Sequence, residues 1–287
     1  MKPAPFDYVR AGSTEEALEA LRQGGGEARV LAGGQSLLPM LNMRLARPAL
    51  LVDIMRVEAL RRVEDRGGNL LVGAGVRQME LERRPDLSRQ QPLLALMLPW
   101  VGHVQTRSRG TVCGSVAHAD PSAEMPLALV ALGGEVHLRT RRRARRVPAE
   151  GFFTGMMVTA RAEDELVEAV AFPARRPGTG YAFREVSRRH GDYAIAACAA
   201  VANAAGLRLA VGGIAAHPMA RSLPLPGTPS GDSALDDALD EFAWDLDARD
   251  DLHASARYRR ELVRRIGREV ARLAVRDRDA RTRKEAA

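Results

Sequence analysis

The sequence predicts two unlike domains, each containing both helices and strands. The chain has 287 residues, of which 46% are hydrophobic, and this is enough for a large core. Residues 173–180, PARRPGTG, carry proline and glycine at both ends, so we expect the domain boundary there. No internal repeat relates the two halves. We therefore expect one domain over residues 1–176, a different one over 177–280, and a charged tail over 281–287.

The first elements follow the order helix, strand, glycine turn, helix. Ser13 and Glu16 have the spacing of a capping box, which begins a helix. A strand is expected over residues 28–32, followed directly by the glycine turn 33–36. A helix over residues 37–44 comes next, with a proline in its first turn.

Hydrophobic patterning predicts the remaining elements. Further strands are expected at residues 49–54, 69–74, 135–140, 166–172 and 207–212. Further helices are expected at residues 79–82, 93–101, 123–132, 192–205 and 252–274. Irregular or frayed chain is expected at residues 102–121, 224–233 and from 276 onward.

Composition argues against several classes of protein. No run of about 18 uncharged apolar residues is present, which argues against a membrane span. Asp7, Glu15 and Glu16 occupy the region where a signal peptide needs an apolar run, so we expect a cytoplasmic protein. Cys113 and Cys198 are too few for an iron–sulfur site, which normally takes four thiolates. Electron chemistry would therefore need an organic cofactor or a partner chain.

The chain is basic, with a net charge of +7. Most of this charge is arginine in two clusters, at residues 139–146 and 257–284. Such a balance is compatible with nucleic-acid binding, but only 4% of residues are aromatic, which argues against stacking on single strands. For the first cluster we favour a solvated hairpin and keep a phosphate-binding or partner-docking patch as the alternative.

Two glycine-bearing loops carry the strongest functional signal. Residues 32–37, AGGQSL, lie between a strand and a helix, and residues 109–115, RGTVCGS, combine small and hydroxyl side chains. Glycine permits close backbone approach to a ligand, so two such loops can cradle a diphosphate. Either loop alone is equally compatible with a tight turn. The GxG at residues 73–75 lacks the rest of a dinucleotide fingerprint, and we interpret it as a strand-ending turn.

Asp120 and Glu124 lie at the start of the helix expected from residue 123, and His118, just before them, could suggest a metal ligand or a covalent flavin link. His118 has no further ligands at metal-binding spacing. Asp120 and Glu124 fit either helix capping or hydrogen bonding to a cofactor, and the spacing alone does not decide between the two.

Longer motifs resemble a known family. The sequence is similar to the medium, FAD-binding subunit of the carbon monoxide dehydrogenase and xanthine dehydrogenase family, the molybdenum hydroxylases. The similarity spans roughly residues 1 to 275. Its motifs are AGGQSLLP at 32–39, RGTVCGS at 109–115, AHADPSAEMP at 117–126, REVSRRHGDYA at 184–194, VGGI at 211–214 and YRR at 258–260.

The resemblance implies a fold and a cofactor. The fold is α+β: a vanillyl-alcohol-oxidase (PCMH) type FAD-binding domain of two subdomains, then a smaller CO dehydrogenase flavoprotein C-terminal domain. The cofactor is FAD, held without a covalent bond. The positions that match cofactor contacts in the family are Arg29, Leu31, Ala32, Gly33, Gly34, Gln35, Ser36, Leu37, Val101, Thr111, Gly114, Ser115, Asp120, Glu124, Leu166, Arg184 and Tyr193.

The resemblance also implies a role in electron transfer. Electrons would pass from a molybdenum cofactor on a large subunit, through [2Fe–2S] clusters on a small subunit, to FAD on this chain and on to an external acceptor. The expected assembly is a dimer of heterotrimers, with Arg184 and Tyr193 tuning the flavin. Two departures from the family pattern are Cys113, where glycine is common, and Arg184, where lysine is frequent. The alternatives are a stand-alone FAD oxidase or reductase of the same fold, and a basic nucleic-acid-binding protein.

Overall fold

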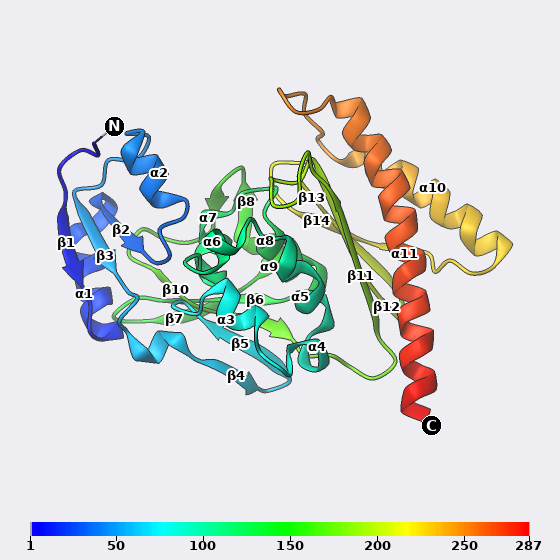
Figure 1. Ribbon diagram of the computed structural model, residues 1–287, viewed down its shortest axis with the longest axis horizontal. Coiled ribbons are helices and arrows are strands. Elements are labelled where there is room, and N and C mark those ends of the chain that lie inside the picture. The colour runs from blue at the N-terminus through cyan, green and yellow to red at the C-terminus, as the bar shows by residue number, and fades with distance from the viewer. Residues whose placement is uncertain (1, 287) are drawn as a thin grey trace.

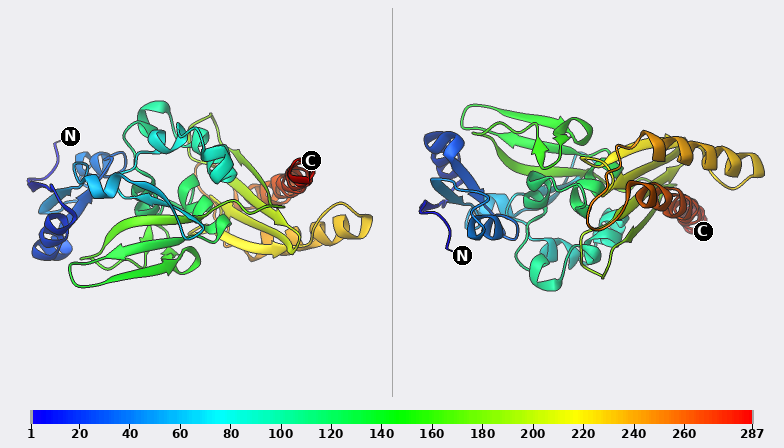
Figure 2. Two further views of the ribbon diagram at one scale, coloured as in Figure 1. Left: turned by 90° about the horizontal axis from the view of Figure 1, so that it is seen from below. Right: turned by 90° about the horizontal axis from the view of Figure 1, so that it is seen from above.

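The three larger β-sheets lie one after another along the long axis of the molecule (Figures 1 and 2). The computed structural model describes residues 2–286. We call the parts built on these sheets the first, central and C-terminal lobes. Helices and strands are mixed in each lobe, which confirms the expected α+β class.

The first lobe is a small parallel sheet covered by one amphipathic helix. Its strands pair in the order β1-β3-β2, all parallel. Ser13 caps α1 as expected, because its hydroxyl accepts a hydrogen bond from the Glu16 N–H at 3.1 Å. The elements are β1 (Asp7–Arg10), α1 (Thr14–Gly24), η1 (Gly25–Glu27), β2 (Ala28–Leu31), α2 (Leu37–Asn42), β3 (Leu50–Asp53) and η2 (Glu58–Arg61).

The central lobe packs short helices on a five-stranded antiparallel sheet of order β4-β5-β10-β6-β7. Its strands are β4 (Val63–Arg66), β5 (Asn69–Gly73), β6 (Glu135–Arg139), β7 (Ala144–Pro148), β10 (Leu166–Pro173) and the separate pair β8 (Phe153–Gly155) and β9 (Val158–Thr159). Its helices are α3 (Gln78–Glu82), α4 (Leu87–Gln90), α5 (Pro92–Met97), η3 (Leu98–Trp100), α6 (Val104–Arg107), α7 (Val112–His118), α8 (Glu124–Leu132) and α9 (Ala149–Phe152).

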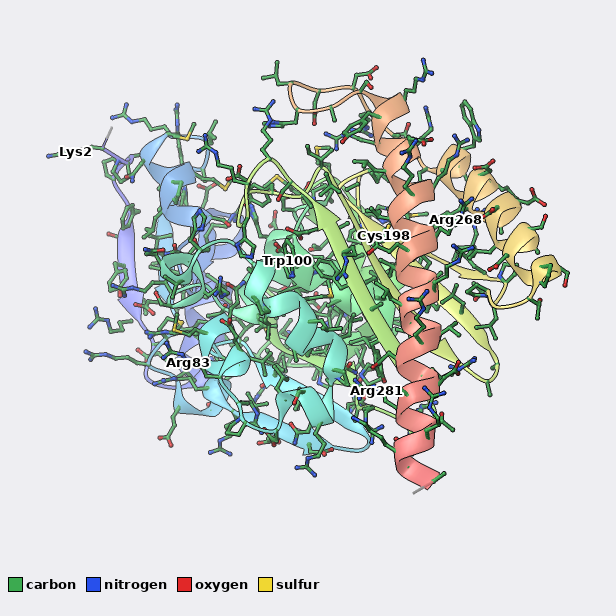
Figure 3. The ribbon with its side chains drawn as sticks, turned by 45° about the vertical axis from the view of Figure 1, so that its right-hand side comes forward. Lys2, Arg83, Trp100, Cys198, Arg268 and Arg281 are labelled. Carbon is green, nitrogen blue, oxygen red and sulfur yellow. The ribbon has the colours of Figure 1, made fainter. Side chains whose placement is uncertain are left out.

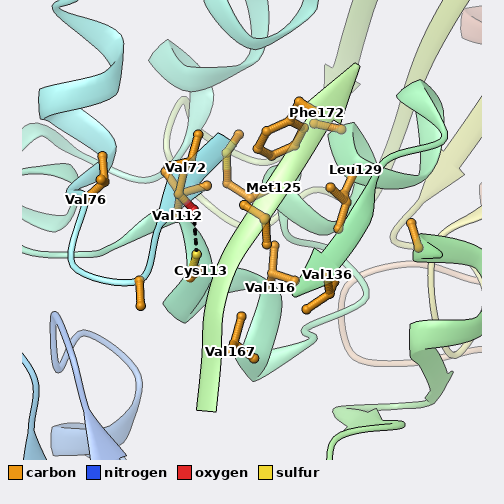
Figure 4. Packing of buried hydrophobic residues seen from close by; sticks show 14 of the residues in the cluster. Val72, Val76, Val112, Cys113, Val116, Met125, Leu129, Val136, Val167 and Phe172 are labelled. Atoms are coloured by element: carbon orange, nitrogen blue, oxygen red, sulfur yellow. Dashed lines mark hydrogen bonds between the residues drawn. The ribbon is translucent and has the colours of Figure 1, made fainter. Parts of the chain in front are cut away.

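The core of the central lobe lies between α7, α8 and the sheet (Figure 4). Cys113 is buried there and its thiol donates to the carbonyl oxygen of Val72 at 3.3 Å. The expectation of an irregular loop over residues 102–121 was wrong in part, because α6 and α7 lie within it. Both helices are shorter than two full turns, so their hydrophobic period is too brief to be recognised in the sequence.

The C-terminal lobe is an antiparallel sheet covered on one face by two long helices. The elements are β11 (Gly180–Val186), β12 (Ala196–Asn203), β13 (Gly206–Gly212), β14 (Met219–Leu223), α10 (Pro229–Asp245) and α11 (Ala256–Ala286). The helix expected over residues 192–205 was wrong, since β12 occupies most of it. Alanine favours helices, but this alanine-rich segment is a central strand buried on both faces, where small side chains let α8 and α11 approach.

The two C-terminal helices are joined by a ladder of ion pairs. On α11, Arg264, Arg268 and Arg272 repeat every four residues and face three aspartates with the same spacing on α10. Arg268, which Figure 3 labels on α11, lies 2.5 Å from Asp236. Two expectations were wrong here. Residues 224–233 are not wholly disordered, because α10 begins at Pro229, and the tail expected to fray from residue 276, including residues 281–286, is helical.

The arginine cluster at residues 139–146 forms the β6–β7 hairpin, as the favoured interpretation predicted. Its guanidinium groups pair with carboxylates: Arg139 lies 2.6 Å from Glu168, and Arg145 lies 2.6 Å from Glu165. Arg141 also pairs with Glu19 of α1. Much of this positive charge is therefore matched within the chain.

Strand β11 joins the central and C-terminal lobes. Tyr181 and Phe183 belong to the core of the central lobe, while Ala182 belongs to the core beneath α11. Phe183 also meets Trp100 edge-on, with ring centroids 6.2 Å apart. Residues 174–179 link β10 to β11, and we keep the end of residue 176 as a proposed domain boundary. Across residues 2–286, no helix is long and apolar enough to cross a membrane.

Candidate functional site

A cleft of about 690 Å³ opens where the three lobes meet. This volume lies within the range of sites for cofactors and other small molecules. The first lobe supplies β2 and the turn after it, the central lobe supplies α7, the beginning of α8 and the segment after β9, and the C-terminal lobe supplies the loop after β11.

The first glycine loop approaches the second so closely that only glycine fits. A Cβ built on Gly33 would stand 2.6 Å from the Cα of Gly110 and closer still to the carbonyl oxygen of Arg109. Gly34 has φ = +72°, a conformation that favours glycine. The two glycines thus serve different purposes: one allows the loops to touch, and the other allows the chain to turn into α2.

The second glycine loop is held in place by Thr111, which begins α7. The Thr111 hydroxyl accepts a hydrogen bond from the Gly114 N–H at 3.0 Å. A Cβ on Gly114 would stand 2.7 Å from that hydroxyl oxygen, so a larger residue would disturb the cap. Cys113 lies inside the same helix, so its φ is helical and the thiol keeps the turn intact.

Two arginines line one end of the cleft, beside β2. Arg29 donates to the carbonyl oxygens of Gly26 and Ala28 at 2.6 and 2.8 Å. Arg161 donates to three carbonyl oxygens between residues 162 and 165, at 2.8 to 3.2 Å. Glu165 also lines the cleft near Arg161, but its carboxylate is paired with Arg145 at 2.6 Å. Burial, and then the nearby Arg29 charge, lower the pKa of Arg161. This end of the cleft is therefore suited to an anionic ligand.

Acidic and aromatic groups line the other end. Glu124 is only 6% exposed, and burial raises its pKa to about 7. Asp120 accepts a hydrogen bond from the Ser122 N–H at 2.8 Å. Burial lowers the pKa of His118, which favours a neutral imidazole. Tyr193 also lines this end and is 64% exposed.

Most of the positions expected to contact the cofactor line this one cleft. They are Arg29, Ala32, Gly33, Gly34, Gln35, Ser36, Leu37, Val101, Thr111, Gly114, Ser115, Asp120, Glu124, Leu166 and Tyr193. Leu31 and Arg184 are not among its lining residues. Strand β2 and the α7 loop are far apart in sequence, so their convergence is information that only the fold supplies.

The placement of Arg184 corrects an expectation. Its guanidinium Nε lies 3.1 Å from Glu269 of α11, on the face of β11 that points away from the central lobe. Side chains alternate along a strand, so the next residue, Glu185, points toward the central lobe. The structure gives no support to Arg184 as a flavin-tuning group. Sequence reasoning missed Arg161, which lines the cleft but carried no motif.

Comparison with known proteins identifies the domains that form the cleft. Residues 4–175 match the family model described as the FAD binding domain in molybdopterin dehydrogenase. Residues 181–273 match the CO dehydrogenase flavoprotein C-terminal domain. The chain belongs to the FAD-binding subunits of the molybdenum hydroxylases. Both expected domains of this flavoprotein family are thereby confirmed.

Relatives and solved structures agree with this assignment. The chain is 35% identical over 275 residues to the nicotine 6-hydroxylase medium subunit of Paenarthrobacter nicotinovorans, covering 93% of this chain and 96% of the relative. The structure of carbon monoxide dehydrogenase from Hydrogenophaga pseudoflava matches with a TM-score of 0.88 and 31% identity, covering 96% of this chain and 98% of that one. Quinoline 2-oxidoreductase from Pseudomonas putida 86 matches with a TM-score of 0.88 and 32% identity, over 96% and 99% of the two chains.

Membership of this flavoprotein family decides between the interpretations of the cleft. The chain is an FAD-binding medium subunit, and its relatives are components of oxidoreductase complexes. In the described part of the chain, residues 2–286, no group of three or more histidine, cysteine, aspartate or glutamate side chains could hold a metal ion.

Proposed function

We propose that FAD lies in this cleft with its ADP half toward Arg29 and Arg161 and its flavin ring toward Tyr193. The observation that carries the proposal is the convergence of the two glycine loops on one cavity, inside the segment that matches the FAD-binding domain. The fit to the cofactor is chemical: FAD carries a diphosphate, and the two arginines that line the cleft within residues 2–286, Arg29 and Arg161, stand at one end of it.

The residues divide into groups by the part of FAD they would hold. The loops at residues 33–36 and 111–115 would hold the diphosphate through backbone N–H groups and hydroxyls. Arg29 and Arg161 would contact the ADP half with the N–H groups that their carbonyl partners leave available. Tyr193 and Asp120 would border the ring and the polyol chain.

We propose a non-covalent cofactor, because the nearest thiol is not positioned to react. Cys113 is fully buried, and its Sγ points to the carbonyl oxygen of Val72. Burial raises the pKa of this thiol, so the nucleophilic thiolate is suppressed. A reactive attachment cysteine would need the opposite environment.

The proposed role is electron transfer within a multi-subunit complex. When bound, FAD accepts one or two electrons, and it can therefore join one-electron iron–sulfur donors to a two-electron acceptor. Relatives include CO dehydrogenase medium chains, and one solved relative is titled a Cu,Mo-CO dehydrogenase. By this similarity the molybdenum cofactor and the [2Fe–2S] clusters would sit on large and small partner subunits, in a dimer of heterotrimers. This chain's own residues hold and orient the flavin.

The experiment is a titration of the FAD-free chain with FAD, followed by acid precipitation. We expect quenching of flavin fluorescence that saturates at one FAD per chain, and release of all flavin into the acid supernatant. FMN should bind much more weakly, because it lacks the AMP moiety and with it one phosphate of the diphosphate. Absence of saturable FAD binding would contradict the proposed site, and flavin retained in the pellet would contradict the non-covalent mode.

A further inference from the structure

Arg259 is a buried arginine in the first turn of α11, outside the cleft. Only 5% of the residue is exposed, and no residue of α11 up to Ala286 lines the cleft. Arg259 belongs to the YRR motif at residues 258–260, to which the binding site gives no role. Arginine is rarely buried unless its guanidinium is paired, so its contacts should explain why it is there.

The guanidinium of Arg259 holds three groups from three segments. Its Nη1 donates to the carbonyl oxygens of Ile195 and Gly213 at 3.0 and 2.5 Å. Its Nη2 donates to the carboxylate of Asp251 at 2.6 Å. A planar guanidinium offers its N–H donors in fixed directions, which an ammonium group cannot reproduce. We call the guanidinium and its two carbonyl acceptors the Arg259 clamp.

The two backbone segments in the clamp are packed directly on each other. Gly213 follows β13 and has φ = +78°, which favours glycine. A Cβ built on it would stand 2.8 Å from the carbonyl oxygen of Ala194 and 3.2 Å from that of Ile195. The turn after β13 and the chain that enters β12 are therefore in backbone contact, and Arg259 bonds to both.

The same turn is bonded to the central lobe. The Gly213 N–H donates to the carbonyl oxygen of Pro121 at 2.8 Å. Pro121 follows Asp120, and Ala194 follows Tyr193. Asp120 and Tyr193 both line the cleft, one from each lobe. The clamp therefore ties together the two backbone segments that carry these residues.

The position of Tyr193 depends on its backbone, because its own side chain is 64% exposed. The loop that carries it is held at two points. Before Tyr193, the ring of His190 lies on Trp100, with ring centroids 4.9 Å apart. After Tyr193, the carbonyl oxygen of Ile195 is held by the clamp. Loosening either point would let Tyr193 move relative to the cleft.

We infer that Arg259 is a positioning residue for the flavin end of the cleft. It fixes where Tyr193 and Asp120 stand relative to each other, and through them it sets how the flavin ring of FAD is held. This inference rests on the proposed binding of FAD in this cleft. Arg259 itself touches no ligand there. It gives the C-terminal lobe a part in holding the cofactor that goes beyond the one loop bordering the cleft.

The test compares three variants of the whole chain. Arg259→Lys keeps the charge but loses the fork that joins the two carbonyl groups. Asp251→Asn leaves the arginine in place and removes only the charge of its partner, so it serves if Arg259→Lys fails to fold. Arg265→Lys is the control, because Arg265 lies on the same helix, is 77% exposed and binds Glu261 at 2.6 Å. Melting temperature and circular dichroism report on the fold.

The first measurement is the dissociation constant of FAD, by fluorescence quenching, beside that of ADP. Arg259→Lys should weaken FAD binding roughly twofold to thirtyfold, the usual range for a residue that acts through its neighbours. Asp251→Asn should lose less, and Arg265→Lys should match the wild type. ADP affinity should stay at the wild-type value in all three, because Arg29 and Arg161 stand at the other end of the cleft.

The second measurement asks whether Arg259 acts through Tyr193. In chains that carry Tyr193→Ala, the loss of FAD affinity caused by Arg259→Lys should be smaller than in the wild type, because the two residues act together. The third measurement uses the FAD-free chain. Hydrogen exchange at the Gly213 amide should be faster in Arg259→Lys, because its hydrogen bond to Pro121 is loosened.

Three results would overturn the inference. They are wild-type FAD affinity in both Arg259→Lys and Asp251→Asn, an equal loss of FAD and ADP affinity, and an undiminished loss in the Tyr193→Ala background. Each of them leaves the FAD site standing. If the wild type binds no FAD, the proposed function fails and the positioning role fails with it. Hydrogen exchange separates the two failures, since it measures the clamp without the cofactor.

Discussion

Gly33 and Gly110 lie in backbone contact, so that a Cβ built on Gly33 would stand 2.6 Å from the Cα of Gly110. This contact joins a turn of the first lobe to a loop of the central lobe, and the cleft lies along the join. A glycine is therefore required at position 33 for the two glycine loops to come into contact.

Gly33→Ala should weaken FAD binding because the added methyl group forces the two loops apart. Overpacking of this size costs about 1–3 kcal/mol, which corresponds to roughly a tenfold to hundredfold rise in the dissociation constant. Gly151→Ala is the matched control, since nothing lies within 4 Å of a Cβ built there. Equal FAD affinity in the two variants would contradict the role assigned to the contact.

Arg161→Ala should weaken binding of both FAD and ADP. A hydrogen bond to a charged group contributes about 1.5–3 kcal/mol, so we expect roughly a tenfold to hundredfold loss, while Arg161→Lys should lose less. Arg146→Ala, on the β6–β7 hairpin outside the cleft, serves as the control. Competition by ADP checks which half of the cofactor is affected. Loss of FAD binding with normal ADP binding would contradict a contact between Arg161 and the ADP half.

Each ion pair between α10 and α11 should contribute little to the free energy of unfolding. Asp236 and Arg268 are both partly exposed, and a pair of this kind is worth about 0.2–1 kcal/mol. A double-mutant cycle of Asp236→Ala and Arg268→Ala, followed by urea unfolding, should give a coupling energy in this range that shrinks in high salt. A coupling energy well above that range, and insensitive to salt, would contradict the partial exposure of the Asp236–Arg268 ion pair.

Glu185→Gln should raise the stability of the chain more at alkaline pH than at acid pH. The pKa of Glu185 is raised to about 8 from 4.5, so between these values the folded chain holds a proton that the unfolded chain has lost. The free energy of unfolding must therefore fall as pH rises through this window. At pH 9 we expect the Tm of the variant to exceed that of the wild type by several degrees, since each unit of pKa shift is worth about 1.4 kcal/mol, with a smaller difference at pH 5. A difference in Tm between the variant and the wild type that stays the same from pH 5 to pH 9 would indicate a packing effect and not a titration.

The order of elements in the first lobe could be predicted from sequence because each boundary has a local cause. Ser13 caps α1, and the turn at residues 33–36 separates β2 from α2, as the sequence predicted. Strand β12 was mistaken for a helix because its alanines have high helix propensity, while its strand conformation depends on pairing with β11 and β13. Helix α10 was not predicted, although Thr228 followed by Pro229 has the pattern of an N-cap with proline at the first position.

The cleft could be predicted in part, and for a definite physical reason. Its glycine loops carry backbone requirements that are visible in the sequence as small residues. Arg161 enters the cleft from an irregular segment whose position depends on β8, β9 and the packing of Glu165 on Arg145. The motif that begins at Arg184 on β11 was recognised in the sequence. The register of β11 decides whether Arg184 or Glu185 faces the central lobe, and a shift of one residue would exchange the two.

The most direct test of the central claim, that this chain relays electrons through FAD as part of a complex, is rapid-mixing reduction of its flavin. The tagged chain is co-expressed with the products of neighbouring genes, purified, analysed for iron and molybdenum, and mixed anaerobically with candidate substrates beside the FAD-loaded chain alone. The account predicts iron- and molybdenum-containing partners in the purified complex, and flavin that bleaches only in the complex. Substrate-dependent bleaching of the chain alone, at the same rate, would contradict it and establish a stand-alone flavin oxidase or reductase.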